Sequence, residues 1–339
     1  MLRSMLEIDK DSLRENVRRI CRFSANKIIA VVKANAYGMG AKGVSRAIEP
    51  LEELYGYAVA CVEEGLELRN GGIKKDILIL GGILPEDVDF IEQFKLTPVV
   101  SDVVHLRALD GKNIKFHVKY DTGMGRLGFL DSLIDDSRMI GIMSHLSSSS
   151  IDESYSNIQI EKFGKIARMH KNVRFIHLQN SAGITYKIHY TNLVRIGLAL
   201  YGEQPCVAYP INLIPSIALK AKIISIKSLP KDHSVSYNKT FTTKQKTTIG
   251  IVSFGYADGL IKSLSNKGFM IVNGIKVPII GDITMDMTIV DITHVRASVG
   301  DWAYIVGQGQ TFTQLASLAG TIPYEIMCNI SDRVKRVYT

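Results

Sequence analysis

Residues 28–43 read IIAVVKANAYGMGAKG, which is an apolar run rich in Ile and Val, then a lysine, then a loop with three glycines. Such a run predicts a buried strand, and the glycines predict a tight connection to the helix-like segment that follows. The same unit of strand, loop and helix-like segment recurs from here to about residue 196. This recurrence is the main signal of the fold in the chain.

Eight apolar segments of this kind follow one another. The predicted strands are IIAVVK (28–33), GYAVAC (56–61), DILIL (76–80), LTPVV (96–100), IKFHVK (114–119), MIGIMSH (139–145), VRFIHL (173–178) and NLVRI (192–196). Eight alternating units in roughly 200 residues predict an α/β fold, a (β/α)8 barrel of the TIM type, with its active site at the carboxyl ends of the strands. A doubly wound sheet is the competing architecture.

The sequence pattern changes after about residue 215, where short alternating strands with turn signals replace the strand, loop and helix units. Asn273-Gly274 lies between two apolar runs and predicts a hairpin, because both residues tolerate the positive φ of a type I′ turn. We therefore expect a barrel domain over residues 9–215 and a mainly-β C-terminal domain over residues 216–339. Residues 1–8 are a candidate extra strand of the second domain.

Composition excludes several classes of protein. The net charge is +8, but the basic residues lie in short, interrupted groups, which argues against a nucleic-acid partner. No apolar run approaches the roughly 20 residues of a membrane span, so we expect no membrane partner. The four cysteines are far apart and form no CxxC pair, which fits a cytoplasmic protein without a disulfide framework or a zinc site.

Chemically competent side chains recur at the predicted strand ends: Lys33, Lys119, His145, His177 and Arg195. So many titratable groups at one face of a barrel favour an active site there over a purely structural role. Lys33 ends an apolar run, where its ammonium would be partly desolvated. From its position alone, it is either an ion-paired lysine or a Schiff-base amine.

Motifs for two other types of site, a dinucleotide site and a hydrolytic site, are either incomplete in context or absent. Gly38, Gly40 and Gly43 formally satisfy G-x-G-x-x-G, which would suggest a nicotinamide-dependent oxidoreductase, but in a dinucleotide fold the strand runs directly into the glycines. No H-E-x-x-H and no G-x-S-x-G occurs, so metal-assisted and serine hydrolysis are not expected and no metal ligand is assigned.

A resemblance covers nearly the whole chain. The motifs VVKANAYG, KYDTGMGRLG, NSA, VRIGLALYG, GYADG and TMD, in that order, closely resemble those of the alanine racemase family of pyridoxal 5′-phosphate (PLP) enzymes. The resemblance implies a barrel followed by a β domain and a head-to-tail homodimer with shared active sites. It also implies interconversion of L- and D-alanine, supplying D-alanine for peptidoglycan.

The resemblance also implies residue roles. Lys33 would carry PLP as a Schiff base, and Tyr256, arriving from the partner subunit, would be the second base on the opposite face of the substrate. His145 and Arg195 would form a relay that lowers the pKa of the Tyr256 phenol, and Arg195 would face the pyridine nitrogen. The other implied cofactor contacts are Tyr37, His177, Asn180, Ser181, Gly197 and Leu198. The implied substrate contacts are Arg126, Lys119, Met285 and Asp286, and Lys119 matches a lysine that family members can carbamylate.

Four positions depart from the common family pattern: Met39, Ser150, Asp282 and Asp332. We hypothesise that the acidic Asp282 and Asp332 loosen the preference for alanine and admit a polar or cationic side chain. A serine or lysine racemase on the same machinery is thus one alternative. A non-enzymatic PLP carrier is another, although such single-barrel proteins lack a β domain with a residue like Tyr256.

Overall fold

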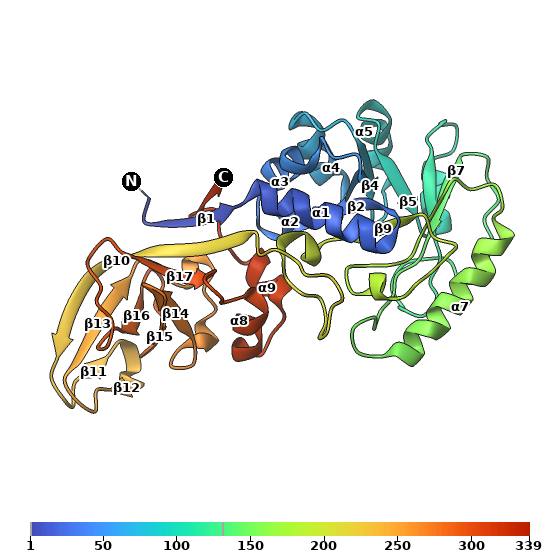
Figure 1. The fold of residues 1–339 in the computed structure, drawn as a ribbon. Coiled ribbons are helices and arrows are strands. Elements are labelled where there is room, and N and C mark those ends of the chain that lie inside the picture. The colour runs from blue at the N-terminus through green and yellow to red at the C-terminus, as the bar shows by residue number, and fades with distance from the viewer. Residues whose placement is uncertain (1, 131) are drawn as a thin grey trace. The chain divides into compact units, whose positions relative to one another are not determined.

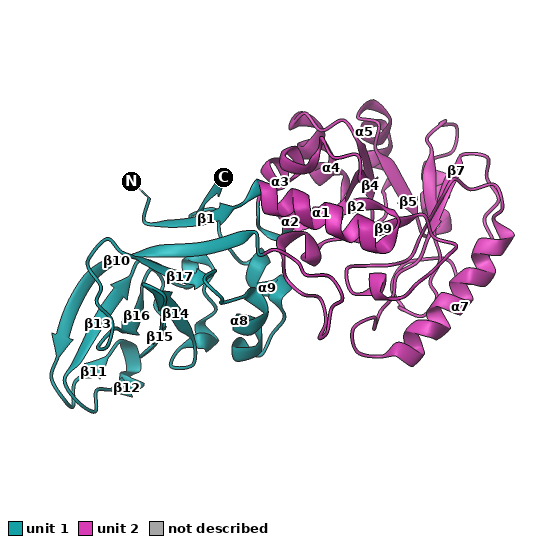
Figure 2. Ribbon diagram, in the orientation of Figure 1, with its two compact units in different colours: residues 1–10, 37–39, 215–339 teal, residues 11–36, 40–214 magenta. Residues whose placement is uncertain are grey.

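The computed structural model describes residues 2–130 and 132–339, and the chain divides into two compact units (Figure 2). The first, called the barrel unit here, contains Asp11–Ala36 and Gly40–Ile214. The second, called the β unit, contains the N-terminal segment through Lys10, the short piece Tyr37–Met39, and Pro215–Thr339.

The core of the barrel unit is a closed, all-parallel barrel of eight strands (Figure 1). The strands are β2 (Lys27–Val31), β3 (Leu54–Val59), β4 (Asp76–Ile79), β5 (Thr97–Val100), β6 (Phe116–Lys119), β7 (Met139–Met143), β8 (Phe175–His177) and β9 (Leu193–Ile196). The last strand pairs with the first, Arg195 opposite Ile29, so no edge is left open. The predicted barrel is therefore confirmed, strand by strand, and the doubly wound alternative is wrong.

Helices follow most of the strands, as the alternating pattern predicts. They are α1 (Lys10–Ser24), α3 (Ala41–Ile48), α4 (Val62–Asn70), α5 (Val88–Gln93), α6 (Val103–Ala108) and α7 (Glu153–Met169). Asp102 caps α6 by accepting a hydrogen bond from the Val104 amide at 3.0 Å, and Gly71 follows the last residue of α4. Asp and Gly are residue types favoured at a helix start and just after a helix end, respectively.

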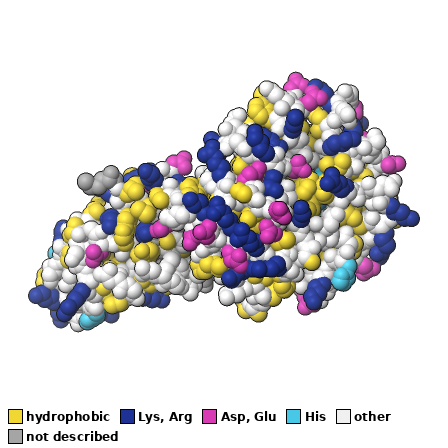
Figure 3. All heavy atoms as spheres, turned by 45° about the horizontal axis from the view of Figure 1, so that its top comes forward, with side chains coloured by type: hydrophobic (Ala, Val, Ile, Leu, Met, Phe, Trp, Pro, Cys, Tyr) yellow, Lys and Arg dark blue, Asp and Glu magenta, His cyan; other side chains and the backbone are white. Residues whose placement is uncertain are grey.

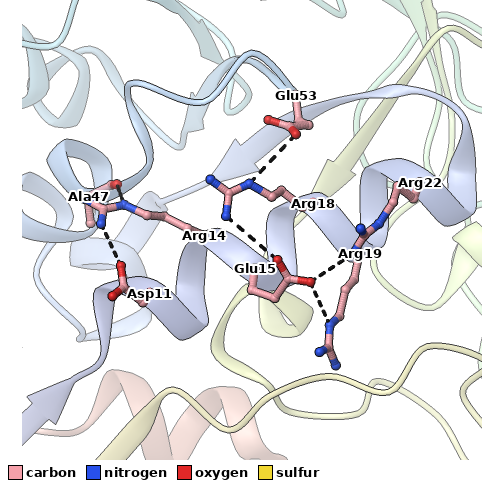
Figure 4. Close-up of polar contacts among 8 residues, drawn as sticks. All are labelled: Asp11, Arg14, Glu15, Arg18, Arg19, Arg22, Ala47 and Glu53. Carbon is pink, nitrogen blue, oxygen red and sulfur yellow. Dashed lines mark hydrogen bonds and ion pairs between the residues drawn. The ribbon is translucent and has the colours of Figure 1, made fainter.

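Helix α1 shows how one helix serves core and solvent at once. Its buried side chains include Leu13, Val17 and Ile20, which recur at the three- and four-residue spacing of one helical face. On the other side, the Glu15 carboxylate lies among Arg18, Arg19 and Arg22, with its nearest contact, to Arg22 Nη2, at 2.9 Å (Figure 4).

The β unit is built on an eight-stranded sheet in which the long β10 (Ile217–Leu229) is central. Its other strands are β1 (Ser4–Ile8), β13 (Thr247–Val252), β14 (Phe269–Val272), β15 (Ile275–Pro278), β16 (Thr288–Asp291), β17 (Trp302–Val306) and β18 (Lys335–Tyr338), and β11 (Ser234–Val235) pairs with β12 (Phe241–Thr242) apart from it. Strand β1 pairs with both β10 and β18. Asn273 and Gly274 join β14 to β15 with φ values of 49° and 79°, which matches the predicted type I′ turn.

Two short helices near the C-terminus were missed by the sequence reasoning: α8 (Phe312–Ala319) and α9 (Pro323–Cys328). The signals were present. Thr311 and Gln314 form a capping box at the start of α8, Gly320 ends it with a φ of 74°, and Pro323 starts α9. The two helices are short and lie between strands, so the surrounding strand pattern outweighs these local signals.

The surface agrees with the composition. On the face drawn in Figure 3, Lys and Arg side chains are interspersed with acidic and apolar ones instead of forming a continuous stripe. Within residues 2–130 and 132–339 no helix is long and apolar enough to cross a membrane. The same residues contain no cluster of three or more His, Cys, Asp and Glu side chains that could hold a metal ion. None of the four cysteines forms a disulfide.

Candidate active site

Lys33 opens an unusual turn directly after β2. The segment Lys33–Tyr37, labelled α2, is left-handed, with φ between 50° and 57° at Ala34, Asn35, Ala36 and Tyr37. A left-handed turn costs about 1–2 kcal/mol per residue for L-amino acids other than glycine. Four successive residues therefore keep this conformation only where surrounding contacts impose it. The turn also separates β2 from Gly38, which removes the dinucleotide interpretation of the glycine pattern.

Hydrogen bonds hold both ends of this turn. The Ala36 amide donates to the Val32 carbonyl at 2.8 Å. The Asn35 side-chain oxygen accepts from the Ala41 amide at 2.7 Å, which ties the turn to the first residue of α3. The Lys33 side chain is half-buried at the mouth of the barrel.

Lys119, the last residue of β6, is 5% exposed. Burial is the main cause that lowers its pKa to about 8, and the charges of Arg195, Arg126 and Lys33 act in the same direction, while Asp121 opposes them. Lys33 and Arg195 from two other strand ends, and Arg126 from the loop after β6, are thus within electrostatic range of Lys119. A site so rich in positive charge favours an anionic ligand.

Asp121 organises the loop that follows β6. Its carboxylate accepts hydrogen bonds from the amides of Gly123 at 2.8 Å, Met124 at 2.7 Å and Arg126 at 3.0 Å. Partial burial pushes the pKa of Asp121 upward, but these amides outweigh it and hold the pKa below its ordinary value. The loop therefore has a fixed backbone from which the exposed Arg126 side chain projects.

Arg195 on β9 is the most heavily bonded group of the site, and it is 2% exposed. Its Nη1 donates to His177 Nδ1 at 2.8 Å and to the His177 carbonyl at 3.1 Å. Its Nη2 donates to His145 Nδ1 at 2.9 Å and to the carbonyls of Ser144 and Leu178. All five bonds use the terminal nitrogens, and Nε bonds to no group in the described part of the chain.

These bonds fix the protons of the neighbouring histidines. A guanidinium only donates, so Nδ1 of both His145 and His177 must accept and their protons must lie on Nε2. Burial, reinforced by the charge of Arg195, lowers the pKa of both rings well below the ordinary value. Both imidazoles are therefore neutral near pH 7.

One member of this network was missed by the sequence reasoning. His177 Nε2 lies 2.8 Å from Nδ1 of His117, a fully buried residue of β6. Because the His177 proton is on Nε2, this nitrogen donates the hydrogen bond and His117 Nδ1 accepts it. The signal was available, since His117 stands two residues before Lys119 and a period of two places both side chains on one face of the strand.

Four of the implied cofactor contacts, Asn180, Ser181, Gly197 and Leu198, lie in the loops after β8 and β9. Ser181 Oγ accepts from the Gly197 amide at 3.1 Å, and Leu198 starts a 3-10 turn, η3 (Leu198–Tyr201), immediately after it. The Asn180 amide oxygen accepts from the Gly183 amide at 2.8 Å and from Ser149 Oγ at 2.9 Å. Hydroxyl and amide donors are thus grouped where barrel enzymes commonly bind phosphate.

In the β unit, Tyr256 starts the 3-10 turn η5 (Tyr256–Asp258) and its side chain is 45% exposed. The amides of Tyr256 and Ala257 donate to the carbonyls of Thr284 and Met285, each at 3.0 Å, so the two loops support each other. Met285 is 53% exposed and is not a core residue.

Other predicted residues of the β unit have structural partners. Asp286 Oδ1 accepts from Arg333 Nη2 at 2.8 Å. Tyr37 is buried, its ring lies 5.7 Å from that of Tyr324 on α9, and burial raises the pKa of its hydroxyl. Tyr37 and Lys33 are close in sequence but fall in different units.

The four departures from the family pattern differ in environment. Asp282 is held, since its carboxylate accepts from Asn238 Nδ2 and Thr240 Oγ1, both at 3.0 Å. Asp332 has a fully exposed side chain and pairs loosely with Arg336 at 3.6 Å. Met39 is fully buried and Ser150 is exposed.

The donor set of the barrel mouth fits PLP. It offers an amine at Lys33, the buried Arg195 guanidinium whose Nε has no acceptor among residues 2–130 and 132–339, and hydroxyl and amide groups at Ser181 and Gly197. These match, in turn, an aldehyde, a ring nitrogen that accepts a hydrogen bond, and a phosphate. An excess of positive charge at the site suits a phosphorylated ligand.

Comparison with known proteins gives the same assignment along the whole chain. The sequence model of the alanine racemase N-terminal domain matches residues 8–205, and that of the alanine racemase C-terminal domain matches residues 216–338. The chain is 55% identical over 337 residues to the alanine racemase of Aquifex aeolicus (strain VF5), covering 99% of both proteins. It is 56% identical to the alanine racemase of Aquifex pyrophilus, covering 99% of this chain and 98% of the relative.

Solved structures agree. Alanine racemase from E. faecalis superposes with a TM-score of 0.93 at 30% identity, covering 100% of this chain and 98% of the other. Alanine racemase from Bartonella henselae, which was solved with covalently bound pyridoxal phosphate, superposes with a TM-score of 0.90 at 28% identity and covers 100% of both chains. With both family domains matched end to end and close relatives over the full length, the chain belongs to the alanine racemase family.

Proposed function

We propose that this chain interconverts L- and D-alanine with PLP as its cofactor. The observation that carries the proposal is the barrel mouth, where a lysine on a strained turn and a buried, multiply bonded arginine both help to lower the pKa of Lys119. The family membership and the relatives named above support the same reaction.

Bound PLP would supply an electron-withdrawing ring that stabilises negative charge on the α-carbon of the amino acid. Lys33 would hold it covalently, while Ser181 and the Gly197 amide would bind its phosphate, with Tyr37, Asn180 and Leu198 as further contacts. Arg195 Nε would donate to the ring nitrogen. Because a fixed guanidinium opposes protonation of that nitrogen, it limits the electron demand of the ring and with it side reactions.

Racemisation needs one group to remove a proton from one face of the α-carbon and another to deliver a proton to the opposite face. We assign these roles to the amine of Lys33 and the phenol of Tyr256. The exposure of Tyr256 and Met285 makes both accessible to a second copy of the chain. We therefore propose a homodimer in which Tyr256 of one subunit serves the barrel of the other.

Arg195 and His145 would prepare the phenol for this role. Because Arg195 donates to His145 Nδ1, the imidazole carries its proton on Nε2 and can donate it to the oxygen of a tyrosine. Such a hydrogen bond would stabilise the phenolate oxygen and so favour the action of the phenol as a base. Arg126 and Lys119, with Met285 and Asp286 from the β unit, would bind the carboxylate of the substrate.

The test is racemisation of L- and D-alanine by the purified protein with added PLP, alongside L-serine and L-lysine. We expect alanine turnover, and an absorption band near ~420 nm that borohydride removes, because this is general PLP Schiff-base chemistry. Lys33→Ala should lose the band. Turnover of serine or lysine in preference to alanine would contradict the substrate assignment and support a role for Asp282 and Asp332 in specificity.

Tyr256→Phe tests the two-base assignment. We expect it to keep the cofactor and lose roughly 10²–10⁴-fold in racemisation, because it deletes the acid–base group on one face only. The partly exposed hydroxyl should be dispensable for folding. Unchanged racemisation in Tyr256→Phe would remove Tyr256 from the mechanism.

We further infer that the enzyme works in the cytoplasm and that its D-alanine feeds peptidoglycan synthesis. The four cysteines, none of which forms a disulfide, are consistent with a reducing compartment.

A further inference from the structure

One acidic side chain joins the turn that carries Lys33 to the rest of the barrel mouth. Glu64 lies in the first turn of α4. Its Oε1 accepts a hydrogen bond from the Ala34 amide at 2.7 Å, and its Oε2 accepts one from the Ala60 amide, also at 2.7 Å. Ala34 is the residue immediately after Lys33, and Ala60 follows the last residue of β3.

The Ala34 amide lies at the exposed start of the turn, where Glu64 gives it a protein acceptor. Ala34 is the first residue with left-handed φ in the turn, at 50°. The turn's other hydrogen bonds lie further along, at Ala36 and Asn35. Glu64 adds a side-chain attachment at Ala34, beside the main-chain bond from the Ala36 amide to the Val32 carbonyl.

Ala60 is in turn tied to the next strand. The Gly81 amide, just after β4, donates to the Ala60 carbonyl at 2.9 Å. The carboxylate therefore links the loops after β2, β3 and β4 at their carboxyl ends. Each carboxylate oxygen accepts from one of the two amides, so Glu64 bridges the two loops with both of its oxygens.

We propose that Glu64 is a positioning residue, which holds the Lys33–Tyr37 turn in its left-handed conformation and so sets the direction of the Lys33 amine toward the cofactor aldehyde. The proposal rests on the proposed function for the role of Lys33. Its structural half, the fixing of the turn, stands on the hydrogen bonds alone.

The test compares Glu64→Gln with Glu63→Gln in the PLP-loaded enzyme. Gln keeps the size of Glu but replaces one acceptor oxygen with an NH2 group, which would face an N–H donor. Glu63 is exposed on the same helical turn and bonds to neither amide, which makes it the matched control. Hydrogen exchange of the Ala34 and Ala60 amides is read first. After removal of PLP with hydroxylamine, the rate at which added PLP becomes trapped on Lys33 by borohydride is read second.

We expect exchange at Ala34 or Ala60 to rise at least ~10-fold in Glu64→Gln and to stay unchanged in Glu63→Gln, because a carboxylate acceptor is lost from only one variant. Trapping on Lys33 should slow by a similar factor. Unchanged exchange would overturn the proposal, and so would faster exchange with undiminished trapping. If Glu64→Gln does not fold, Glu64→Asp is used instead, because it keeps the charge but is too short to reach both amides. Wild-type protection of both the Ala34 and Ala60 amides from exchange in Glu64→Asp would also overturn the proposal.

These readouts separate the two hypotheses. If wild-type enzyme traps no PLP on Lys33, the proposed function has failed, and the exchange data still decide whether Glu64 holds the turn. If wild-type enzyme traps PLP and Glu64→Gln leaves hydrogen exchange at Ala34 and Ala60 unchanged, the proposed function stands and the positioning role is refuted.

Discussion

Gly141→Ala should destabilise the barrel, and the loss in the free energy of unfolding follows from the neighbours of Gly141. Gly141 of β7 pairs with His117 of β6 on one side and with Phe175 of β8 on the other. The two rings stack across it, with centroids 5.6 Å apart and planes 15° apart. A Cβ at position 141 would lie 2.6 Å from both Cε1 and Nδ1 of His117.

The His117 ring would have to move by roughly 1 Å to restore ordinary contact at about 3.5–4.0 Å. It cannot do so freely, because its Nδ1 lies 2.8 Å from Nε2 of His177. Overpacking costs about 1–3 kcal/mol, and a weakened bond that leaves a buried donor unmet costs about 1–3 kcal/mol. Replacing a strand glycine returns about 0.5–1 kcal/mol. We expect a net loss of about 2–4 kcal/mol in the free energy of unfolding.

The assay is thermal unfolding of the purified enzyme, in which this loss should lower the midpoint by ~3–6 °C, given an unfolding entropy of about 2.1 cal/mol/K for each of the 339 residues. Gly250→Ala is the matched control, since a Cβ there meets its nearest atoms at an ordinary 3.4 Å. Adding His117→Asn should make Gly141→Ala nearly free of cost, because the ring is gone while an acceptor oxygen remains. A wild-type midpoint in Gly141→Ala, or the same loss in both backgrounds, would refute the reasoning.

Three further outcomes are expected. Asn16→Leu should destabilise the enzyme by about 3 kcal/mol or more in denaturant unfolding, because the fully buried Asn16 amide makes three hydrogen bonds to main-chain groups; a loss under about 1 kcal/mol would contradict this. Lys119, with its pKa lowered to about 8, should form a carbamate with ¹³C-bicarbonate near pH 8, giving a ¹³C signal that is absent in Lys119→Met. Arg19 and Arg22 hold the pKa of Glu15 below its ordinary value, so the stability that Glu15 contributes should be complete above about pH 5 and be lost as the pH falls through the folded-state pKa. The gap in midpoint between wild type and Glu15→Gln should therefore close on acidification, and a gap independent of pH would exclude this contribution.

Much of the fold could be predicted from the sequence because its signals are local. Each barrel strand is a run of Ile and Val bounded by turn residues, and the eight runs were placed to within a few residues. The Asn273-Gly274 turn was predicted from two residues, since its backbone requires positive φ at both. The helices α8 and α9 were missed although their caps are equally local, because the surrounding pattern was read as strand throughout.

The candidate site divides in the same way. Lys33, Lys119, His145, His177 and Arg195 were found because a parallel barrel brings strand ends to one face, so position along the chain is enough to group them. Their partners could not be found in this way. Which atom of each ring accepts a proton depends on angles and distances between strands, and a sequence contains neither.

The sequence by itself determined that this chain closes into a barrel, carries a second β-rich unit and places a lysine at the first strand end. Only the tertiary structure decided that the lysine begins a left-handed turn, that Glu64 accepts the amide beside it, and that His117 completes the chain of imidazoles behind Arg195. The physical reason is range. Hydrophobic periodicity acts over a few residues, whereas these hydrogen bonds join groups that approach within 3 Å only after strands far apart in the sequence have been brought into register.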